Sequence, residues 1–407
     1  MKAGIGYCNE KDSFVSGEII ARQAISEGGL SSPDFALAFC HGQMDHNEFY
    51  KGMRKILGAD VQIIGGSAIG IITNNYLSYK GYPSGAVVVE SGGIGYHVAS
   101  ENGLDKDEKE TGKRFAAKFP QKTQEKLLFM LYDSIKKPGD GNAPPLLNSS
   151  SPLIEGIEEV LSLGIPIIGA GVLGDYDMNP TNQFCGFHVG TQSVAGIMLS
   201  GDFEPYYRIM HGCTPLDGIY HRITKTDGPI IYELDDKPIV KMIDDIYGHQ
   251  NWRDQKPVSL LTIGVNHGDR FKEPEETDYV NRLILGALPD GEGVCLFEPD
   301  IKKGTEIQFM LRDSETMIAS AKNNSGQLIE QIIEDGKKPF LGIYIDCAGR
   351  AADYLNISTE EACEVQKTLN QYDIPLLGFY SGVEIAPLLN KSRGLDWTGV
   401  LLVIAGN

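Results

Sequence analysis

The sequence predicts an α/β fold in which repeated strand–helix–strand units form two mixed, layered sheets with helices packed outside. The first observation is a glycine phrase that occurs three times, each time directly after an apolar strand. The second is the approach to each phrase, where a helix-like stretch, a polar break and a strand follow one another. A sequence that repeats itself in this way indicates copies of one supersecondary unit. The phrases lie at 63–70, 167–174 and 376–384.

The first copy is expected to contain two strands and two helices before its phrase. Apolar residues recur near helical spacing in the helices, and the second strand is almost continuously apolar, which is typical of a strand buried on both faces. The expected order is strand 2–8, helix 14–27, strand 34–40 and helix 46–57. After the phrase, residues 86–98 predict a hairpin, because Gly92-Gly93 supplies a turn that reaches positive φ without steric cost.

The second copy follows the same order. A charged helix at 105–119 ends at Pro120, and an apolar strand follows at 126–133. Ser151-Pro152 opens the next helix, since serine can cap a helix and proline suits its first position. The second phrase comes next, and residues 187–199 predict a second hairpin.

The composition changes after Ser200, where short strands and a helix at 238–247 precede a polar boundary. The remaining expected elements belong to the third copy and its approach: strands 258–265, 281–288, 293–298 and 305–311, helix 314–334, strand 340–346, helix 359–371 and strand 399–404. These predictions divide the chain into an α/β domain at 1–200, a junction segment at 201–257 and a second α/β domain at 258–407.

Composition and charge limit the function classes. The 407 residues carry a formal net charge of −19, which argues against nucleic acid or an anionic membrane surface as a partner because both would repel the chain. The seven cysteines are scattered without a C-x-x-C motif, which favours a reducing compartment. No apolar run approaches the roughly 20 residues that span a bilayer. We therefore expect a cytoplasmic protein with no membrane partner.

The sequence patterns that resemble cofactor or metal motifs do not indicate such sites. Residues 169–174 match G-x-G-x-x-G, but the following 175–180 are turn-like and no carboxylate lies near Thr191, so the match does not indicate a dinucleotide site. No Walker motif is present. His41 and His46 with Asp45 could suggest a metal, yet two histidines five residues apart face different sides of a helix, and we expect this stretch to be a loop. We expect no cofactor and no metal.

The glycine phrases have two interpretations. They are either turns imposed by the architecture or backbone N–H groups that open towards a small anion, and Gly65, Gly66 and Ser67 are candidates for the second. Only the third phrase adds a phenol and a carboxylate, Tyr380 and Glu384, beside Gly378. A carboxylate can hold an ammonium group while backbone amides hold a carboxylate.

The strand before the third phrase ends in Asp346-Cys347-Ala348-Gly349-Arg350. Arg350 suits bidentate binding of a carboxylate, although a surface arginine or a sheet-edge ion pair would leave the same pattern. Cys347, near a helix start and an arginine, is a candidate nucleophile, but the adjacent Asp346 works against a lowered pKa of its thiol.

These motifs, taken as a set, resemble the FIST family, which pairs an N-terminal with a C-terminal FIST domain. The matching stretches are 61–67, 229–238, 291–296, 301–307, 347–350 and 377–387. The resemblance implies that 1–200 is the FIST-N-like part, that 258–407 is the FIST-C-like part, and that the chain is a standalone two-domain member. It departs from the family pattern at Val383, where glycine usually precedes the glutamate.

The resemblance also implies a sensory module that binds a small ligand, with amino acids as the usual suggestion. Carried over residue by residue, it implies a pocket near Cys347, Arg350, Gly378, Tyr380 and Glu384. We therefore expect a ligand-binding protein, rather than an enzyme, that signals through a separate partner. A hydrolase or transferase that uses Cys347 and a non-catalytic interaction scaffold stay open as alternatives.

Overall fold

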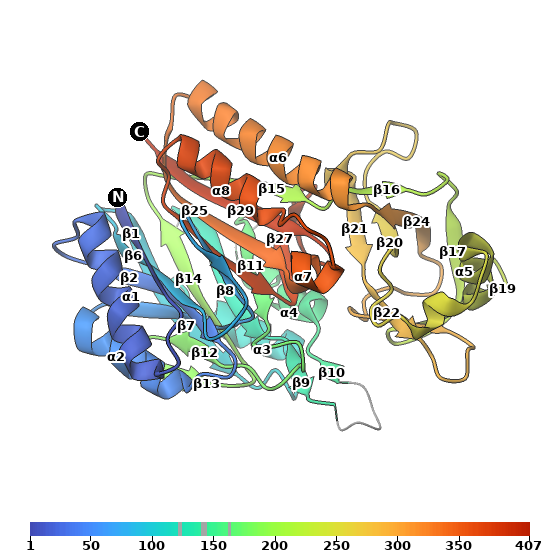
Figure 1. Cartoon of the computed structure of the whole chain (residues 1–407), viewed down its shortest axis with the longest axis horizontal. Helices are drawn as coiled ribbons and strands as arrows, with labels where there is room; N and C mark the ends of the chain where they lie inside the picture. The colour runs from blue at the N-terminus through green and yellow to red at the C-terminus, as the bar shows by residue number, and fades with distance from the viewer. Residues whose placement is uncertain (121–123, 140–144, 162–163) are drawn as a thin grey trace.

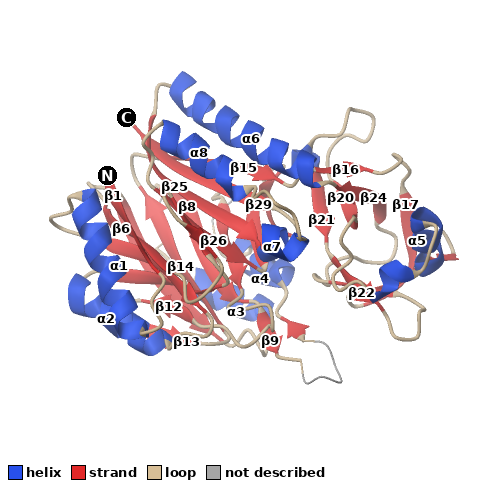
Figure 2. Cartoon of the chain, in the orientation of Figure 1, coloured by secondary structure: helices blue, strands red, loops and turns tan. Residues whose placement is uncertain are grey.

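The structure is a computed structural model that describes residues 1–120, 124–139, 145–161 and 164–407. A body built of three six-stranded mixed sheets fills most of the molecule, and a nine-stranded sheet stands beside it on the right of Figure 1. Helices lie on the outer faces of the body, as Figure 2 shows. The α/β class with helices outside mixed sheets is confirmed, and the large sheets are more numerous than the two expected.

The three sheets of the body share one strand order. The first sheet runs β1 (Lys2–Cys8), β6 (Ser84–Glu90), β2 (Phe35–His41), β3 (Gln62–Ala68), β12 (Gln183–Cys185), β13 (His188–Gly190). The second runs β7 (Gly95–Asn102), β14 (Ser193–Ser200), β8 (Glu125–Asp133), β11 (Ile167–Val172), β27 (Val383–Leu388), β28 (Lys391–Leu395). The third runs β15 (Glu204–Met210), β29 (Gly399–Gly406), β25 (Lys338–Cys347), β26 (Leu376–Ser381), β4 (Ile71–Thr73), β5 (Leu77–Ser78).

In each sheet the two central strands are parallel, and every other pairing is antiparallel. The second strand of each parallel pair carries a glycine phrase. The chain then leaves the sheet, because the hairpin that follows each phrase joins a different sheet. Thus β4–β5 pairs with β26, β12–β13 pairs with β3, and β27–β28 pairs with β11. The three sheets therefore exchange hairpins in a closed cycle.

The two predicted hairpins, 86–98 and 187–199, are wrong. Their strands form, but β6 and β7 lie in different sheets, and so do β13 and β14. The strands pair elsewhere: β6 is inserted between β1 and β2, and β14 between β7 and β8, while β13 pairs with β12. A glycine pair allows the chain to turn, but it does not decide which strands pair afterwards.

One pair of helices covers the outer face of each sheet. The pairs are α1 (Ser13–Gly28) with α2 (His46–Leu57), α3 (Glu108–Ala116) with α4 (Ser150–Glu158), and α6 (Ser314–Glu334) with α8 (Ala362–Gln371). Aspartates cap several N-termini; the Asp12 and Asp313 side chains accept hydrogen bonds from Val15 N–H and Thr316 N–H. Among the described helices, none combines the length and the apolar character that crossing a membrane requires.

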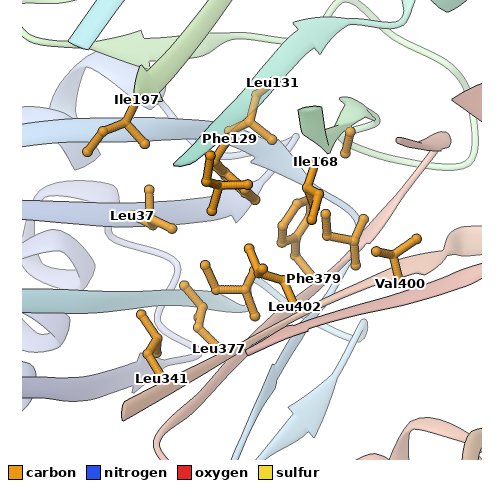
Figure 3. Packing of buried hydrophobic residues seen from close by; sticks show 14 of the residues in the cluster. Leu37, Phe129, Leu131, Ile168, Ile197, Leu341, Leu377, Phe379, Val400 and Leu402 are labelled. Atoms are coloured by element: carbon orange, nitrogen blue, oxygen red, sulfur yellow. The ribbon is translucent and has the colours of Figure 1, made fainter. Parts of the chain in front are cut away.

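The inner faces of the three sheets enclose one shared hydrophobic core. Figure 3 shows side chains from all three sheets that point towards each other, and the rings of Phe39 and Phe379 stack with centroids 3.9 Å apart. Leu37, Phe129 and Ile168 are at most 2% exposed in the same core. Since burial of apolar area is the main favourable contribution to folding, this core holds the sheets together.

The glycine phrases permit the close approach of the central strands. A Cβ atom on Gly65 would lie 1.7 Å from the carbonyl oxygen of Ala38, and one on Gly169 would lie 1.8 Å from that of Met130. Both carbonyls belong to the neighbouring parallel strand. At these two glycines, therefore, the architectural interpretation of the phrases accounts for the residue type.

The nine-stranded sheet is formed by the chain between β15 and α6. Its strands are β16 (Cys213–Pro215), β17 (His221–Asp227), β18 (Ile230–Leu234), β19 (Lys237–Pro238), β20 (Leu261–Asn266), β21 (Tyr279–Arg282), β22 (Ile284–Ala287), β23 (Val294–Leu296) and β24 (Glu306–Arg312). Helix α5 (Ile239–Tyr247) and the buried Trp252 complete a hydrophobic core of its own. Shorter elements are β9 (Ile135–Lys137), β10 (Leu146–Leu147) and α7 (Ala352–Leu355).

Replacement of Gly169 tests whether the close approach of strands β11 and β8 requires glycine. We expect Gly169→Ala to lower the free energy of unfolding by about 1–3 kcal/mol, because the added methyl group overlaps backbone that cannot move aside. Gly326→Ala is the matched control: a Cβ there meets nothing within 4 Å, and alanine in helix α6 should add about 0.5–1 kcal/mol. Urea unfolding measures both, and equal effects of the two substitutions would contradict the account.

Candidate functional site

The strand ends that carry the phrases meet at one end of the body. Gly42 N–H donates to Gly174 O at 2.9 Å, Gly382 N–H to Gly171 O at 2.8 Å, and Tyr380 N–H to Gly70 O at 3.1 Å. Each of these bonds joins segments from two different copies of the repeated unit. Strand ends from all three copies therefore converge at this end of the body, and in open α/β sheets the corresponding edge is where ligands bind.

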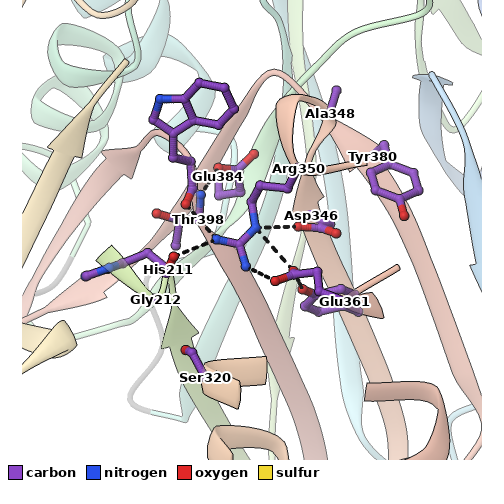
Figure 4. A network of polar contacts seen from close by, with 12 residues as sticks. His211, Gly212, Ser320, Asp346, Ala348, Arg350, Glu361, Tyr380, Glu384 and Thr398 are labelled. Atoms are coloured by element: carbon purple, nitrogen blue, oxygen red, sulfur yellow. Dashed lines mark hydrogen bonds and ion pairs between the residues drawn. The ribbon is translucent and has the colours of Figure 1, made fainter. Parts of the chain in front are cut away.

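Arg350 lies at this end, in a short 3-10 helix (Ala348–Arg350) after β25, and it is 1% exposed. Its guanidinium pairs with Glu361, lies 3.2 Å from Asp346 Oδ1, and donates to the carbonyl oxygens of His211 (3.1 Å) and Trp397 (2.8 Å), as Figure 4 shows. The pKa of Arg350 is raised well above its usual value despite burial, because Glu361 and Asp346 surround it. Its donors are thus engaged within the protein.

The predicted residues around Arg350 are buried as well. Glu384 accepts from Ser381 Oγ at 2.8 Å and from Thr398 N–H at 3.3 Å, and burial raises its pKa well above the ordinary range. Tyr380 donates to Glu360 Oε1 at 2.6 Å, and Gly378 is an internal residue of β26.

Cys347 is 3% exposed, and burial, followed by the nearby Glu384, raises the pKa of its thiol well above 9. A nucleophilic cysteine needs the opposite shift, because the thiolate is the reactive form. The environment of Cys347 therefore does not favour the hydrolase or transferase alternative.

Gly65, Gly66 and Ser67 lie in β3, apart from this cluster in the first sheet. Ser67 Oγ is 2.8 Å from His46 Nε2 and accepts from Asn182 N–H at 3.0 Å. Burial lowers the pKa of His46 to about 4, so the ring is neutral at neutral pH. Among the described residues, no group of three or more His, Cys, Asp and Glu side chains is arranged to hold a metal ion.

Sequence reasoning missed the two carboxylates that complete the Arg350 cluster, Glu360 and Glu361. Glu361 binds Arg350 and accepts from Tyr344 Oη at 2.6 Å, while Glu360 accepts from Tyr380 and Tyr79. The one sequence signal for them is that two acidic residues stand directly before helix α8. The sequence does not show which cation pairs with them, because Arg350 comes close only in the folded structure.

A cavity of about 460 Å³ lies between the body and the nine-stranded sheet. Helix α4 and β28 form its walls on the body side, and β20, β21 and the segment 299–305 form the opposite wall. Its volume is within the range of small-molecule sites, which are often found where two structural units meet. The residues that line it include Ser149, Ser151, Glu155, Glu158, His267, Arg282, Asp300, Lys302, Lys391, Ser392 and Arg393.

The deep wall of the cavity is an arginine–carboxylate network. Arg282 is 2% exposed; it donates from Nε to Asp300 Oδ1 at 2.7 Å and from Nη1 to Gly394 O at 3.1 Å, which joins β21 to β28. Glu298 lies beside it and accepts from Ser149 Oγ at 3.1 Å and from Ser150 N–H, at the start of α4. The network fixes the nine-stranded sheet against the two body elements that line the cavity.

Burial raises the pKa of Glu298 to about 8, although Arg282 opposes the shift. Burial likewise raises the pKa of Asp396 to about 6. At neutral pH Glu298 therefore carries a proton in the folded protein, and Arg282 is left with Asp300 as its closest ionised partner. Burial and nearby Arg393 lower the pKa of His267 to about 4, so this ring is neutral too.

The cationic lining of the cavity was not predicted. Lys302 follows β23, and Lys391 and Arg393 belong to β28, so they are separated by about a hundred positions in the chain. Their one sequence signal is the alternation Lys391-Ser392-Arg393, which puts both cations on one face of a strand.

Glu298→Gln tests the buried proton. Folded Glu298 keeps its proton above the pH at which the unfolded chain loses it, so the stability it contributes falls as pH rises from about 5 to 8, by at most about 1.4 kcal/mol per pH unit. In Glu298→Gln this decrease in stability with rising pH should be absent. In the exposed control Glu330→Gln it should be as large as in the wild type. Urea unfolding at several pH values measures the slopes, and identical slopes in wild type and Glu298→Gln would contradict the protonated state.

Alkylation tests the environment of Cys347. At pH 7.5 we expect iodoacetamide to modify the half-buried Cys295 and Cys363 before Cys347, which should react only after unfolding because its thiol is buried and its pKa is raised. Peptide mass spectrometry measures the order. Selective modification of Cys347 in the folded protein would instead favour the enzyme alternative.

Comparisons with known proteins place the chain in a family. The family model of the FIST N domain matches residues 34–237, and that of the FIST C domain matches 241–387. Two uncharacterized proteins, from Mycobacterium bovis and Mycobacterium tuberculosis, are 26% identical over 231 residues, which is 56% of this chain and 58% of each relative. The chain thus spans less than two thirds of the curated relatives it matches.

Among solved structures, a chorismatase aligns with 99% of this chain and 98% of its own at 9% identity and a TM-score of 0.34. A cyanuric acid hydrolase from A. caulinodans aligns with 100% and 99% at 10% identity and a TM-score of 0.35. These scores are too low to indicate a shared fold. The two family models together match most of the chain, and the protein belongs to the FIST family, with a FIST N domain followed by a FIST C domain.

Proposed function

We propose that the protein is a cytoplasmic sensor that binds a small, amino-acid-like ligand in the cavity between α4, β28 and the nine-stranded sheet. FIST domains are sensory domains that bind small ligands in signalling proteins. The observation that carries the proposal is the cavity itself, because it has the volume of a ligand site and lies where segments of both family domains meet.

The lining offers both charges that an amino acid requires. Arg393, whose Nε is buried without a hydrogen-bond partner among the described residues, can donate to a carboxylate. Glu158 lies on the same side of the cavity and can accept from an ammonium group. The Arg350 cluster offers less, because its cation and carboxylates are already engaged with each other. We therefore place the ligand at the cavity and treat Arg350 and Glu384 as residues that maintain the strand ends.

Signalling follows from the position of the cavity. A ligand that contacts Arg393 on β28 and Lys302 on the opposite wall would favour one arrangement of the nine-stranded sheet relative to the body. A separate partner protein that recognises this arrangement would transmit the signal.

A thermal-shift panel of the twenty amino acids tests the proposal. Ligand at about 100 times its dissociation constant should add about 2.7 kcal/mol to the free energy of unfolding. Arg393→Ala should abolish the shift, because a charge-assisted contact is lost, whereas Arg22→Ala, an exposed arginine on α1, should retain it. A shift that persists in Arg393→Ala would contradict this location, and the absence of any shift would contradict an amino-acid-like ligand.

A further inference from the structure

We infer that the cavity selects small ligands with two negative charges, either a second carboxylate or a phosphate ester. This inference rests on the proposed function and narrows its ligand class. The observation behind it is the juxtaposition of Lys302, Lys391 and Arg393 around a space that offers one carboxylate without a cationic partner, Glu158.

The three cations are unpaired within the described part of the chain. Lys302, Lys391 and Arg393 form no ion pair within 4 Å there, whereas the fourth cation of the lining, Arg282, pairs with Asp300. Arg393 Nε is buried and has no hydrogen-bond partner in the described ranges. A buried guanidinium donor in this state loses its hydration without compensation, so an anion in the cavity would stabilise it.

The cations approach the cavity from two sides. Lys391 and Arg393 are two residues apart on β28 and therefore share one face, while Ser392 between them accepts from Ile167 N–H inside the sheet. Lys302 belongs to the opposite wall, in the segment that links β23 to β24. A ligand between the walls can consequently contact cations at both of its ends.

The carboxylates of the lining compensate these cations only in part: burial and nearby Arg282 lower the pKa of Arg393, while Asp300 and Glu158 oppose the shift without forming an ion pair with it within 4 Å. Glu155 is 2.9 Å from Lys109 on helix α3, and Asp300 is held by Arg282. Glu158 accepts from the N–H of Ser392 at 3.3 Å and is attracted by Arg393, but it forms no ion pair within 4 Å in the described chain. Three cations thus face Glu158, and a ligand with one ammonium group and two anionic groups would offer a partner to Glu158 and to at least two of the cations.

The acidic surroundings of the cavity make its positive charge selective for anionic ligands. The chain as a whole carries a net charge of −19, so a dianion is repelled from most of the surface and attracted only where cations are concentrated. Arg393 is half-buried, so its attraction to an anion is screened less than that of the exposed Lys302 and Lys391. Each charge-assisted hydrogen bond to the second anionic group should then raise affinity about tenfold or more.

Isothermal titration of the full chain with two matched pairs of probes tests the inference. L-Glutamate is compared with L-glutamine, which has the same size but a neutral side chain, and O-phospho-L-serine is compared with L-serine. We expect the dianionic member of at least one pair to bind about tenfold or more tightly. The pair with the larger difference shows whether a carboxylate or a phosphate is the second group.

Two lysine variants make the test specific. Lys302→Ala should reduce the difference within the pair, because it removes a contact to the second anionic group, whereas Lys303→Ala removes the neighbouring charge outside the cavity lining and should leave the difference unchanged. Lys391→Ala should act as Lys302→Ala does. Circular dichroism of each variant establishes that it is folded.

The outcomes separate the two proposals. If glutamine or serine binds as tightly as its dianionic counterpart, or if the difference survives both Lys302→Ala and Lys391→Ala, the dianion inference is wrong while the ligand cavity stands. If none of the four probes binds the folded wild-type chain, the dianion inference fails, and the panel of twenty amino acids decides whether the amino-acid-like ligand fails with it.

Discussion

The exchange of hairpins among the three sheets is the constraint on which the rest of the structure depends. Each sheet receives a hairpin from a segment that follows another sheet's phrase. Without that hairpin, the sheet would end at β3, β11 or β26 with a row of unpaired backbone groups. The exchange satisfies those groups and fixes each sheet against the next around the shared core. It also sets the cavity, because β28 reaches the second sheet, beside α4, only as part of a borrowed hairpin.

Local structure could be predicted from the sequence more fully than pairing could. Helical spacing and apolar runs located α2 at 46–57 and α6 at 314–334, and the glycine phrases marked the central strands of all three sheets. The hairpins at 86–98 and 187–199 failed because a turn signal is local, whereas strand pairing is decided by partners far along the chain. The domain limits at 200 and 257 stay predictions.

For the candidate site, too, one part could be predicted from the sequence and another could not. The resemblance to the family implied one pocket around Cys347, Tyr380 and Glu384, and the structure buries all three side chains, with Glu384 near enough to Cys347 to add to the effect of burial on the pKa of its thiol. Whether any of them binds a ligand stays a prediction. The cavity could not be predicted from the sequence, because single lysines and arginines are common on surfaces and only the complete fold brings Lys302 close to Lys391.

Two buried arginines join the nine-stranded sheet to the body. Arg350 of the body donates to the carbonyl of His211, where the chain leaves β15, and His211 N–H in turn donates to Glu276. Arg282 of the nine-stranded sheet donates to Gly394 on β28. Both bonds join a buried guanidinium to a backbone carbonyl, and a hydrogen bond to a charged group typically contributes about 1.5–3 kcal/mol.

The exchange of hairpins also governs the order in which the protein can be completed during synthesis. The hairpin β4–β5 is made early, but its partner β26 follows much later: 302 residues separate Asn74 from Leu376, whose N–H binds the Asn74 side chain. At typical translation rates this interval lasts roughly 15 to 60 s. Ile71 and Ile72, buried in the finished protein, have no sheet to join throughout that time. Until the third phrase has been synthesised, the apolar β4–β5 hairpin therefore lacks the strand that completes its sheet.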